Sequence, residues 1–211
     1  MKKPSVFVIG DSISCYYGKH LQKMLEGVFD YDRKGGRHTL KDLDDGTDGV
    51  NGGDSTMVLT YVRELRRRGN FKPDYVLLNC GHHDTKKDPA TLKNQIPPEL
   101  YEKNLRTVCD LMREMATKVI WVRTTPFNEE FVFPQDSPHI RTIEDTHLYD
   151  RIAGGVMKEY RIPTVDLYTF TVNLGGGIYF DHYIHFDEAA AAKQAAFIAG
   201  YLDALVLGGH Y

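Results

Sequence analysis

Short apolar runs alternate with longer amphipathic stretches along this chain. Runs of four or five apolar residues are typical of buried strands, whereas apolar positions three and four residues apart are typical of helices. The alternation predicts a parallel sheet that is covered by helices. The expected strands are residues 5–9, 75–79, 119–122 and 163–167, with a further short strand near Phe29.

Amphipathic stretches follow these runs. The first helix is expected directly after residue 10, and the others at residues 55–68, around 105–115, at 148–160 and at 188–206. The positions expected to face inward are Tyr17, Leu21, Met24 and Leu25, then Val58, Tyr61, Val62 and Leu65, then Leu105, Val108, Met112 and Met115, and finally Phe197, Ile198, Leu202 and Leu205. The chain is therefore predicted to form an α/β fold, a three-layer α/β/α sandwich with a mainly parallel central sheet.

Two long segments lack periodicity. Residues 30–53 are rich in glycine and aspartate, and residues 126–146 contain three phenylalanines and three prolines. A long aromatic segment is more often a functional loop or a cover over a site than a plain connection. We find no repeat, low-complexity tract or linker, so the sequence predicts a single domain over residues 1–211.

Composition excludes several classes of protein. The 211 residues are 42% apolar and 26% charged, with a net charge of −3 and the two signs interspersed, so no nucleic-acid partner is expected. The run 66–68 of three arginines is expected to be the solvated end of a helix. No apolar run reaches 18 residues, so no membrane partner is expected either. The oligomeric state is not predicted.

The three cysteines have neither metal-ligand spacing nor the pattern of a disulfide framework. The first strand is expected within a few residues of Met1, and no signal peptide precedes it. Two compartments are consistent with this: the chain is cytosolic, or it is an exported protein from which the signal has been removed.

The first motif with chemical potential is Gly10-Asp11-Ser12-Ile13-Ser14, where the first strand ends and the first helix begins. Ligands of open α/β sheets bind beyond the carboxyl ends of the strands. A serine there also benefits from the N–H groups of a helix N-terminus, which favour a developing negative charge. The alternative is that Ser12 or Ser14 only caps the helix.

Three further motifs lie at equivalent junctions: residues 52–56 (Gly-Gly-Asp-Ser-Thr), residues 81–84 (Gly-His-His-Asp) and residues 181–186 (Asp-His-Tyr-Ile-His-Phe). The first of these can supply a backbone N–H that approaches a reacting oxygen, and the second a side-chain N–H donor. The third can supply a histidine base with a carboxylate nearby. Taken singly, each is more typical of a turn or a solvated loop. Their joint occurrence at one edge of one sheet favours an active site.

The order of these four motifs resembles the SGNH/GDSL hydrolase family, and the resemblance spans residues 6–205. It implies that Ser12 is the nucleophile and that His185 is its base, with Asp181 orienting the histidine. It also implies an oxyanion hole formed by the backbone N–H groups of Ser12 and Gly53 and by the side chain of His83. No metal and no cofactor are implied.

The chain departs from the family pattern at two positions. The family usually has asparagine where this chain has His83, although a neutral histidine N–H can donate in its place. The family also places its aspartate three residues before the histidine, whereas Asp181 lies four before His185 and position 182 is a histidine. A bulge in the turn can absorb the extra residue. Otherwise the enzyme works as a Ser-His dyad, or His182 takes part.

Residues 73–84 and 119–127 resemble members of the family that act on acetylated carbohydrates. The expected function is therefore serine-dependent hydrolysis of small acyl esters, most specifically O-acetyl groups on a carbohydrate. Aromatic side chains near the motifs could stack on a sugar ring or belong to the core, and the core is expected for Tyr17. The others are Tyr16, Phe127 and Phe131.

Three alternatives remain. A metal-dependent hydrolase would use the cluster His82, His83, Asp84, Asp181, His182 and His185. A lipase-like or thioesterase activity would act on longer acyl chains. A non-catalytic relative would bind glycans without turnover.

Overall fold

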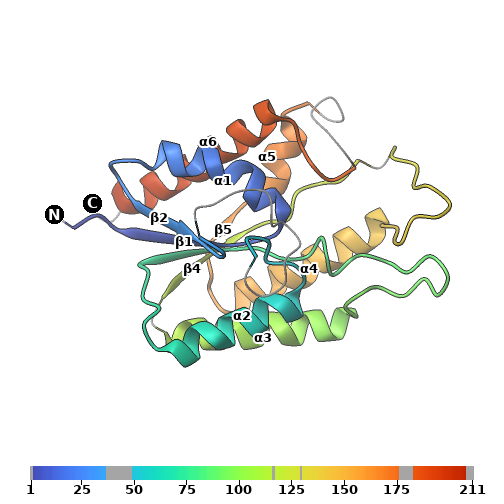
Figure 1. The fold of residues 1–211 in the computed structure, drawn as a ribbon, viewed down its shortest axis with the longest axis horizontal. Coiled ribbons are helices and arrows are strands. Elements are labelled where there is room, and N and C mark those ends of the chain that lie inside the picture. Colours follow the sequence, from blue (N-terminus) through green and yellow to red (C-terminus); the bar gives the residue numbers. More distant parts are fainter. Residues whose placement is uncertain (1, 37–48, 116, 129, 176–182, 208–211) are drawn as a thin grey trace.

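The computed structural model describes residues 2–36, 49–115, 117–128, 130–175 and 183–207. Within them, five parallel strands form a sheet in the order β2-β1-β3-β4-β5 (Figure 1). The strands are β1 (Ser5–Ile9), β2 (Asp30–Arg33), β3 (Tyr75–Leu78), β4 (Lys118–Val122) and β5 (Thr164–Val165). In sheets of this order, ligands bind at the carboxyl ends of β1 and β3, where the winding reverses.

Helices cover both faces of the sheet (Figure 1). One layer contains α1 (Ser12–Met24), α5 (Leu167–Asn173) and α6 (Glu188–Leu207), and the other contains α2 (Ser55–Arg68), α3 (Pro98–Glu114) and α4 (Ile143–Glu159). The predicted three-layer α/β/α sandwich is confirmed. Among the described residues, no helix is long and apolar enough to cross a membrane.

A separate core fills the space on each side of the sheet. Alternate residues of a strand point to opposite faces, so Val76 and Leu78 pack with Trp121 against α2, α3 and α4. Leu77 points the other way and packs with Leu21 and the helices α1 and α6. Strands β1, β3 and β4 are mainly apolar because both faces of the sheet are covered there. The edge strand β2 instead alternates exposed and buried residues.

Helices α3, α4 and α5 differ from the sequence prediction, as does β5. Helix α3 begins at Pro98, seven residues before the expected start near residue 105. β5 is only two residues long, because Asp166 accepts a hydrogen bond from the Thr169 amide at 3.1 Å and starts the unpredicted helix α5. Helix α4 begins at Ile143, five residues earlier than predicted, because Thr142 caps it through the Asp145 amide.

Two side chains that were predicted to face inward are exposed. Met24 is 44% exposed, because α1 ends there and Leu25, which is 1% exposed, takes the inward position. Leu205 is 36% exposed and borders an open groove beside β4. The arginine run was predicted correctly: residues 66–68 end α2, and Gly69 follows in the left-handed conformation at φ 70°.

Candidate active site

The candidate nucleophile Ser12 is the first residue of α1, directly after the short turn that follows β1. The helix cap is Asp11, whose Oδ1 accepts a hydrogen bond from the Ile13 amide at 3.0 Å. Ser14 is buried, and its hydroxyl donates to the Asp11 carbonyl at 2.6 Å. Ser12 Oγ instead lies 2.9 Å from Nε2 of His185. Of the two serines, Ser12 is therefore the one beside the candidate base.

His185 lies three residues before the start of α6, and α6 packs alongside α1 (Figure 1). The flanking Ile184 and Phe186 are both buried, and Asp187 Oδ1 accepts the Ala190 amide at 2.7 Å. Asp187 therefore caps α6. The imidazole of His185 stacks on the Tyr16 ring, with centroids 4.8 Å apart and planes 24° apart, so the ring contacts α1 at two points.

The glycines of the second motif allow it to reach the end of β1. The Gly52 amide donates to the Gly10 carbonyl at 2.7 Å, and a Cβ atom on Gly52 would lie only 2.9 Å from that oxygen. Gly53 has φ +68°, and a Cβ atom there would lie 2.4 Å from Met57 Sδ. In this structure the Gly53 N–H donates to Asn51 Oδ1 at 2.9 Å.

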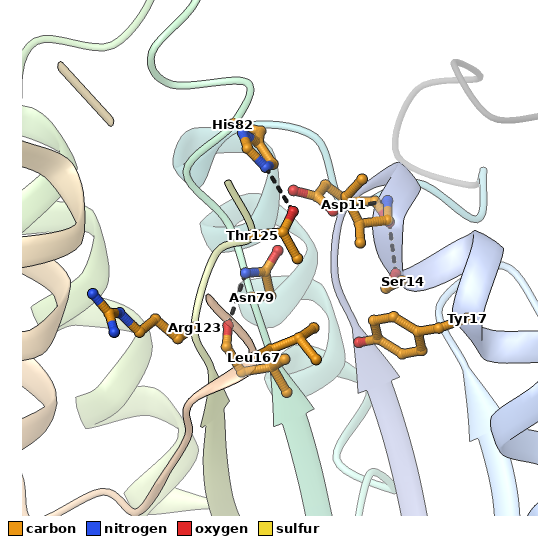
Figure 2. Close-up of a pocket in the computed structure, with 10 residues that line it drawn as sticks. Asp11, Ser14, Tyr17, Asn79, His82, Arg123, Thr125 and Leu167 are labelled. Atoms are coloured by element: carbon orange, nitrogen blue, oxygen red, sulfur yellow. Dashed lines mark hydrogen bonds between the residues drawn. The ribbon is translucent and has the colours of Figure 1, made fainter. Parts of the chain in front are cut away.

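The third motif packs against the second. Both carboxylate oxygens of Asp84 accept the Ser55 amide, at 2.9 and 3.1 Å, which ties the loop to the N-terminus of α2. His83 Nε2 lies 3.5 Å from Asn51 Nδ2. His82 points elsewhere, and its Nε2 lies 3.1 Å from the Thr125 hydroxyl beyond β4 (Figure 2). The two adjacent histidines therefore have different surroundings, and His83 is the one beside the glycine loop.

Burial controls the ionisation of the groups around the site. Burial, with the positive charges of Lys86 and Arg141, lowers the pKa of His83 to about 3. Burial, with the positive charge of Arg141, also lowers the pKa of His82 well below its usual value. Burial raises the pKa of Asp11 to about 6 and that of Asp84 to about 7. Both histidines are thus neutral at physiological pH, and a neutral imidazole has one N–H donor and one acceptor nitrogen.

Sequence reasoning missed Arg141, which joins two of the motifs. Its Nε donates to the His82 carbonyl at 3.0 Å, and its NH1 group donates to the Tyr183 hydroxyl at 2.5 Å. The guanidinium also lies 5.0 Å from the centroid of the Tyr183 ring. Burial lowers the pKa of Arg141. The only available signal was its place in the aromatic segment 126–146.

The same segment contacts the turn before α6 at further points. The Asn128 amide donates to the Tyr183 carbonyl at 2.7 Å, and His139 Nε2 lies 2.9 Å from the Tyr183 hydroxyl. The rings of Phe131 and Phe133 each lie 5.2 Å from the Tyr183 ring. These five side chains, Phe131, Phe133, His139, Arg141 and Tyr183, form what we call the rim cluster.

Two buried cations of β2 and its following turn were also missed. Arg33 donates to the carbonyls of Ser14 and Val50 at 2.9 and 3.1 Å, and Lys34 donates to the carbonyls of Gly49 and Asn51. They join the residues before the glycine motif to α1 and β2. Polar pattern alone does not identify such residues, because most of these partners are backbone carbonyls.

Several sequence-based assignments cannot be placed. Asp181 and His182 lie outside the described residues, so the orienting role of Asp181 stays a prediction.

Other residues singled out in the sequence are placed by the structure. Tyr17 and Phe127 are 2% and 6% exposed, and Tyr17 belongs to the core as expected. The cysteines Cys15, Cys80 and Cys109 are free and buried. Within the described part of the chain, no three histidine, cysteine or acidic side chains are grouped as metal ligands.

Comparison with solved structures gives similar folds at low identity. An acetyl xylan esterase, AlAXEase, matches with a TM-score of 0.67 and 16% identity, over 93% of this chain and 98% of that one. A lipase/acylhydrolase from Enterococcus faecalis has the same TM-score and identity, over 94% and 95%. TesA matches with a TM-score of 0.62 and 21% identity, over 94% and 97%. A search of curated protein sequences finds no match.

The sequence itself matches a family model over residues 8–193, which is most of the chain and includes Ser12 and His185. That model describes the GDSL-like lipase/acylhydrolase family. The chain belongs to the GDSL-like lipase/acylhydrolase family and is an ester hydrolase.

Proposed function

We propose that this enzyme hydrolyses small acyl esters, specifically O-acetyl groups on a carbohydrate, through an acyl-enzyme on Ser12. The observation that carries the mechanism is the 2.9 Å distance between Ser12 Oγ and His185 Nε2. That distance is within the range needed for a general base to take the proton of a nucleophile. Ser14 lacks this relationship, because its hydroxyl is buried against the Asp11 carbonyl.

In the first half of the reaction, His185 Nε2 accepts the hydroxyl proton while Ser12 Oγ attacks the ester carbonyl. The carbonyl oxygen becomes an oxyanion, which the positive end of the α1 helix dipole favours. His185 then returns the proton to the leaving alcohol. In the second half, a water loses its proton to His185 and attacks the acyl carbonyl. His185 then returns the proton to Ser12 Oγ as its bond to the acyl carbon breaks and the acid is released.

The surroundings of the base favour a ring-shaped alcohol. Tyr16 stacks on His185. The rim cluster contains Tyr183, two residues before the base, and its Phe131 and Phe133 rings lie beside the Tyr183 ring. Aromatic side chains at the edge of a site present flat apolar faces, to which the C–H face of a sugar ring can pack. The fold is shared with AlAXEase, whose name describes an acetyl xylan esterase.

A small cavity lies beneath the site, and its lining residues include neither Ser12 nor His185. The cavity between the ends of the strands and α1 measures about 10 Å³ and is lined by Asp11, Ser14, Tyr17 and His82 among others (Figure 2). That volume corresponds to about one water molecule. The cavity therefore fits a buried water and does not decide the length of the acyl group, which has to be measured.

The test is a chain-length series of nitrophenyl esters, from acetate to decanoate, together with acetylated xylan and an acetylated monosaccharide. We expect kcat/KM to be highest for acetate, and we expect release of acetate from the carbohydrates. A maximum at long chains would assign the enzyme to the lipase or thioesterase activities. Binding of the acetylated sugars without turnover of any ester would show a non-catalytic relative.

A further inference from the structure

Asn51 lies between Gly53 and His83, the two groups that the family resemblance assigns, beside Ser12, to the oxyanion hole. It is 4% exposed, and its carbonyl accepts a hydrogen bond from Lys34 Nζ at 2.9 Å. Its side chain faces Gly53 on one side and His83 on the other. The hydrogen bond from the buried Lys34 holds the Asn51 backbone. The hydrogen bond from the Gly53 amide orients the Asn51 side chain.

The orientation of the Asn51 amide follows from its partners. The Gly53 N–H can only donate, so the atom 2.9 Å away must be the amide oxygen. The amide nitrogen therefore faces His83, with Nδ2 at 3.5 Å from Nε2, the upper limit for a hydrogen bond. An amide NH₂ group can donate but cannot accept. His83 Nε2 must then be the acceptor in this pair.

This assignment determines where the proton of His83 lies. The imidazole is neutral, because burial and the nearby cations lower its pKa to about 3. A neutral imidazole has one protonated nitrogen, and Nε2 is taken as the acceptor, so the proton lies on Nδ1. We propose that Asn51 is a positioning residue that holds His83 in the tautomer presenting Nδ1–H to the developing oxyanion. The catalytic part of this proposal rests on the proposed esterase function.

The substitution Asn51→Asp tests the tautomer with little change in shape. An aspartate keeps an oxygen for the Gly53 amide, but it replaces the donor facing His83 by an acceptor. The proton of His83 is then drawn to Nε2, and Nδ1 can no longer donate. Loss of one oxyanion donor typically lowers kcat on the order of 10²-fold, so we expect a decrease of that size with a smaller change in KM.

The matched control is the same substitution in a His83→Asn background. An asparagine side chain has no tautomer, so only the added negative charge and any structural disturbance remain. We expect Asn51→Asp to lower kcat much less in the His83→Asn enzyme than in the enzyme with His83. Equal fold-losses in the two backgrounds would overturn the proposal, because charge and structure act in both.

A direct measurement needs neither a variant of Asn51 nor any ester. Two-bond proton–nitrogen NMR spectra of the ¹⁵N-histidine-labelled enzyme distinguish the protonated from the unprotonated ring nitrogen, and His83→Asn identifies the signals of His83. We expect a protonated Nδ1 and an unprotonated Nε2 between pH 5 and 8. A protonated Nε2 would overturn the proposal. Since the spectrum is recorded without substrate, its outcome is independent of whether the enzyme uses Ser12.

Discussion

The guanidinium of Arg141 donates a hydrogen bond to the hydroxyl of Tyr183 across 2.5 Å. The same guanidinium donates to the carbonyl of His82. Tyr183 lies two residues before His185, and His82 lies directly before His83. Arg141 therefore connects the turn that carries the candidate base to the loop that carries a candidate oxyanion donor.

This connection predicts that Arg141→Met lowers kcat by more than its effect on stability can explain. A displacement of about 1 Å in a catalytic group can cost on the order of 10²-fold in rate. Arg141→Lys keeps the charge but lacks the planar fork that reaches two acceptors, so it should restore only part of the loss. Steady-state kinetics per folded molecule, with urea unfolding for stability, measure both effects.

The control for this prediction is Arg151→Met on α4, since Arg151 is an exposed arginine. It should leave kcat unchanged. If Arg141→Met is as active per folded molecule as Arg151→Met, then Arg141 only supports the fold and does not position the two loops.

The two aspartates around His185 should respond differently to substitution. Asp187 caps α6, so Asp187→Ala should lower the free energy of unfolding by roughly 0.5–2 kcal/mol and leave kcat nearly unchanged. Asp181→Asn should instead lower kcat by several orders of magnitude, since an equivalent change in a serine protease triad costs about 10⁴-fold. The opposite pattern would assign the orienting role to Asp187, and near-normal kcat in both variants would indicate a Ser12–His185 dyad.

Hydrolysis should increase with pH as His185 loses its proton, because only the neutral imidazole can act as a base. His83 and His139 do not contribute between pH 5 and 8, since burial lowers their pKa values to about 3 and about 4. Profiles recorded at two temperatures identify the group, because histidine ionisation depends on temperature more strongly than carboxyl ionisation. A flat pH–rate profile, or a profile whose midpoint does not change with temperature, would argue against a histidine base.

Asp84 should make an unusual contribution to stability. Its carboxyl pKa is raised by burial from 3.8 to about 7, despite the hydrogen bonds from Ser55. Between these values the folded protein binds more protons than the unfolded chain, so the contribution of Asp84 falls as the pH rises. Wild type should therefore lose stability relative to Asp84→Asn from pH 4 to 7, by up to about 1.4 kcal/mol per pH unit, and the difference should be constant above pH 8.

Urea unfolding of both proteins across this pH range provides the measurement. If wild type instead gains stability over Asp84→Asn as the pH rises, the ionised carboxylate is stabilised by the Ser55 amide more than it is destabilised by burial.

The sequence predicted those parts of the molecule that depend on local pattern. Strand β1 and helix α2 were predicted with the correct bounds, since apolar runs and helical spacing are local properties. Ser12 was singled out because a strand-to-helix junction has a known place in such folds. The short helix α5 was missed because seven residues carry too little periodicity to identify a helix.

The roles of Arg141 and Asn51 could not be predicted from local pattern. Arg141 meets Tyr183 across 42 residues of sequence, and Asn51 meets His83 across 32. Their other partners include backbone groups, such as the His82 carbonyl and the Gly53 amide. Residue type does not reveal contacts with backbone groups. Only the three-dimensional arrangement identifies them.

Covalent labelling tests the central claim, that Ser12 is the nucleophile activated by His185. A fluorophosphonate reacts with an activated serine hydroxyl, and tandem mass spectrometry of the peptide that contains both Ser12 and Ser14 locates the phosphonyl group. We expect one group per chain on Ser12, labelling retained in Ser14→Ala, and loss of both labelling and ester hydrolysis in Ser12→Ala. A label on Ser14 or Cys15, or wild-type turnover by Ser12→Ala, would contradict the account.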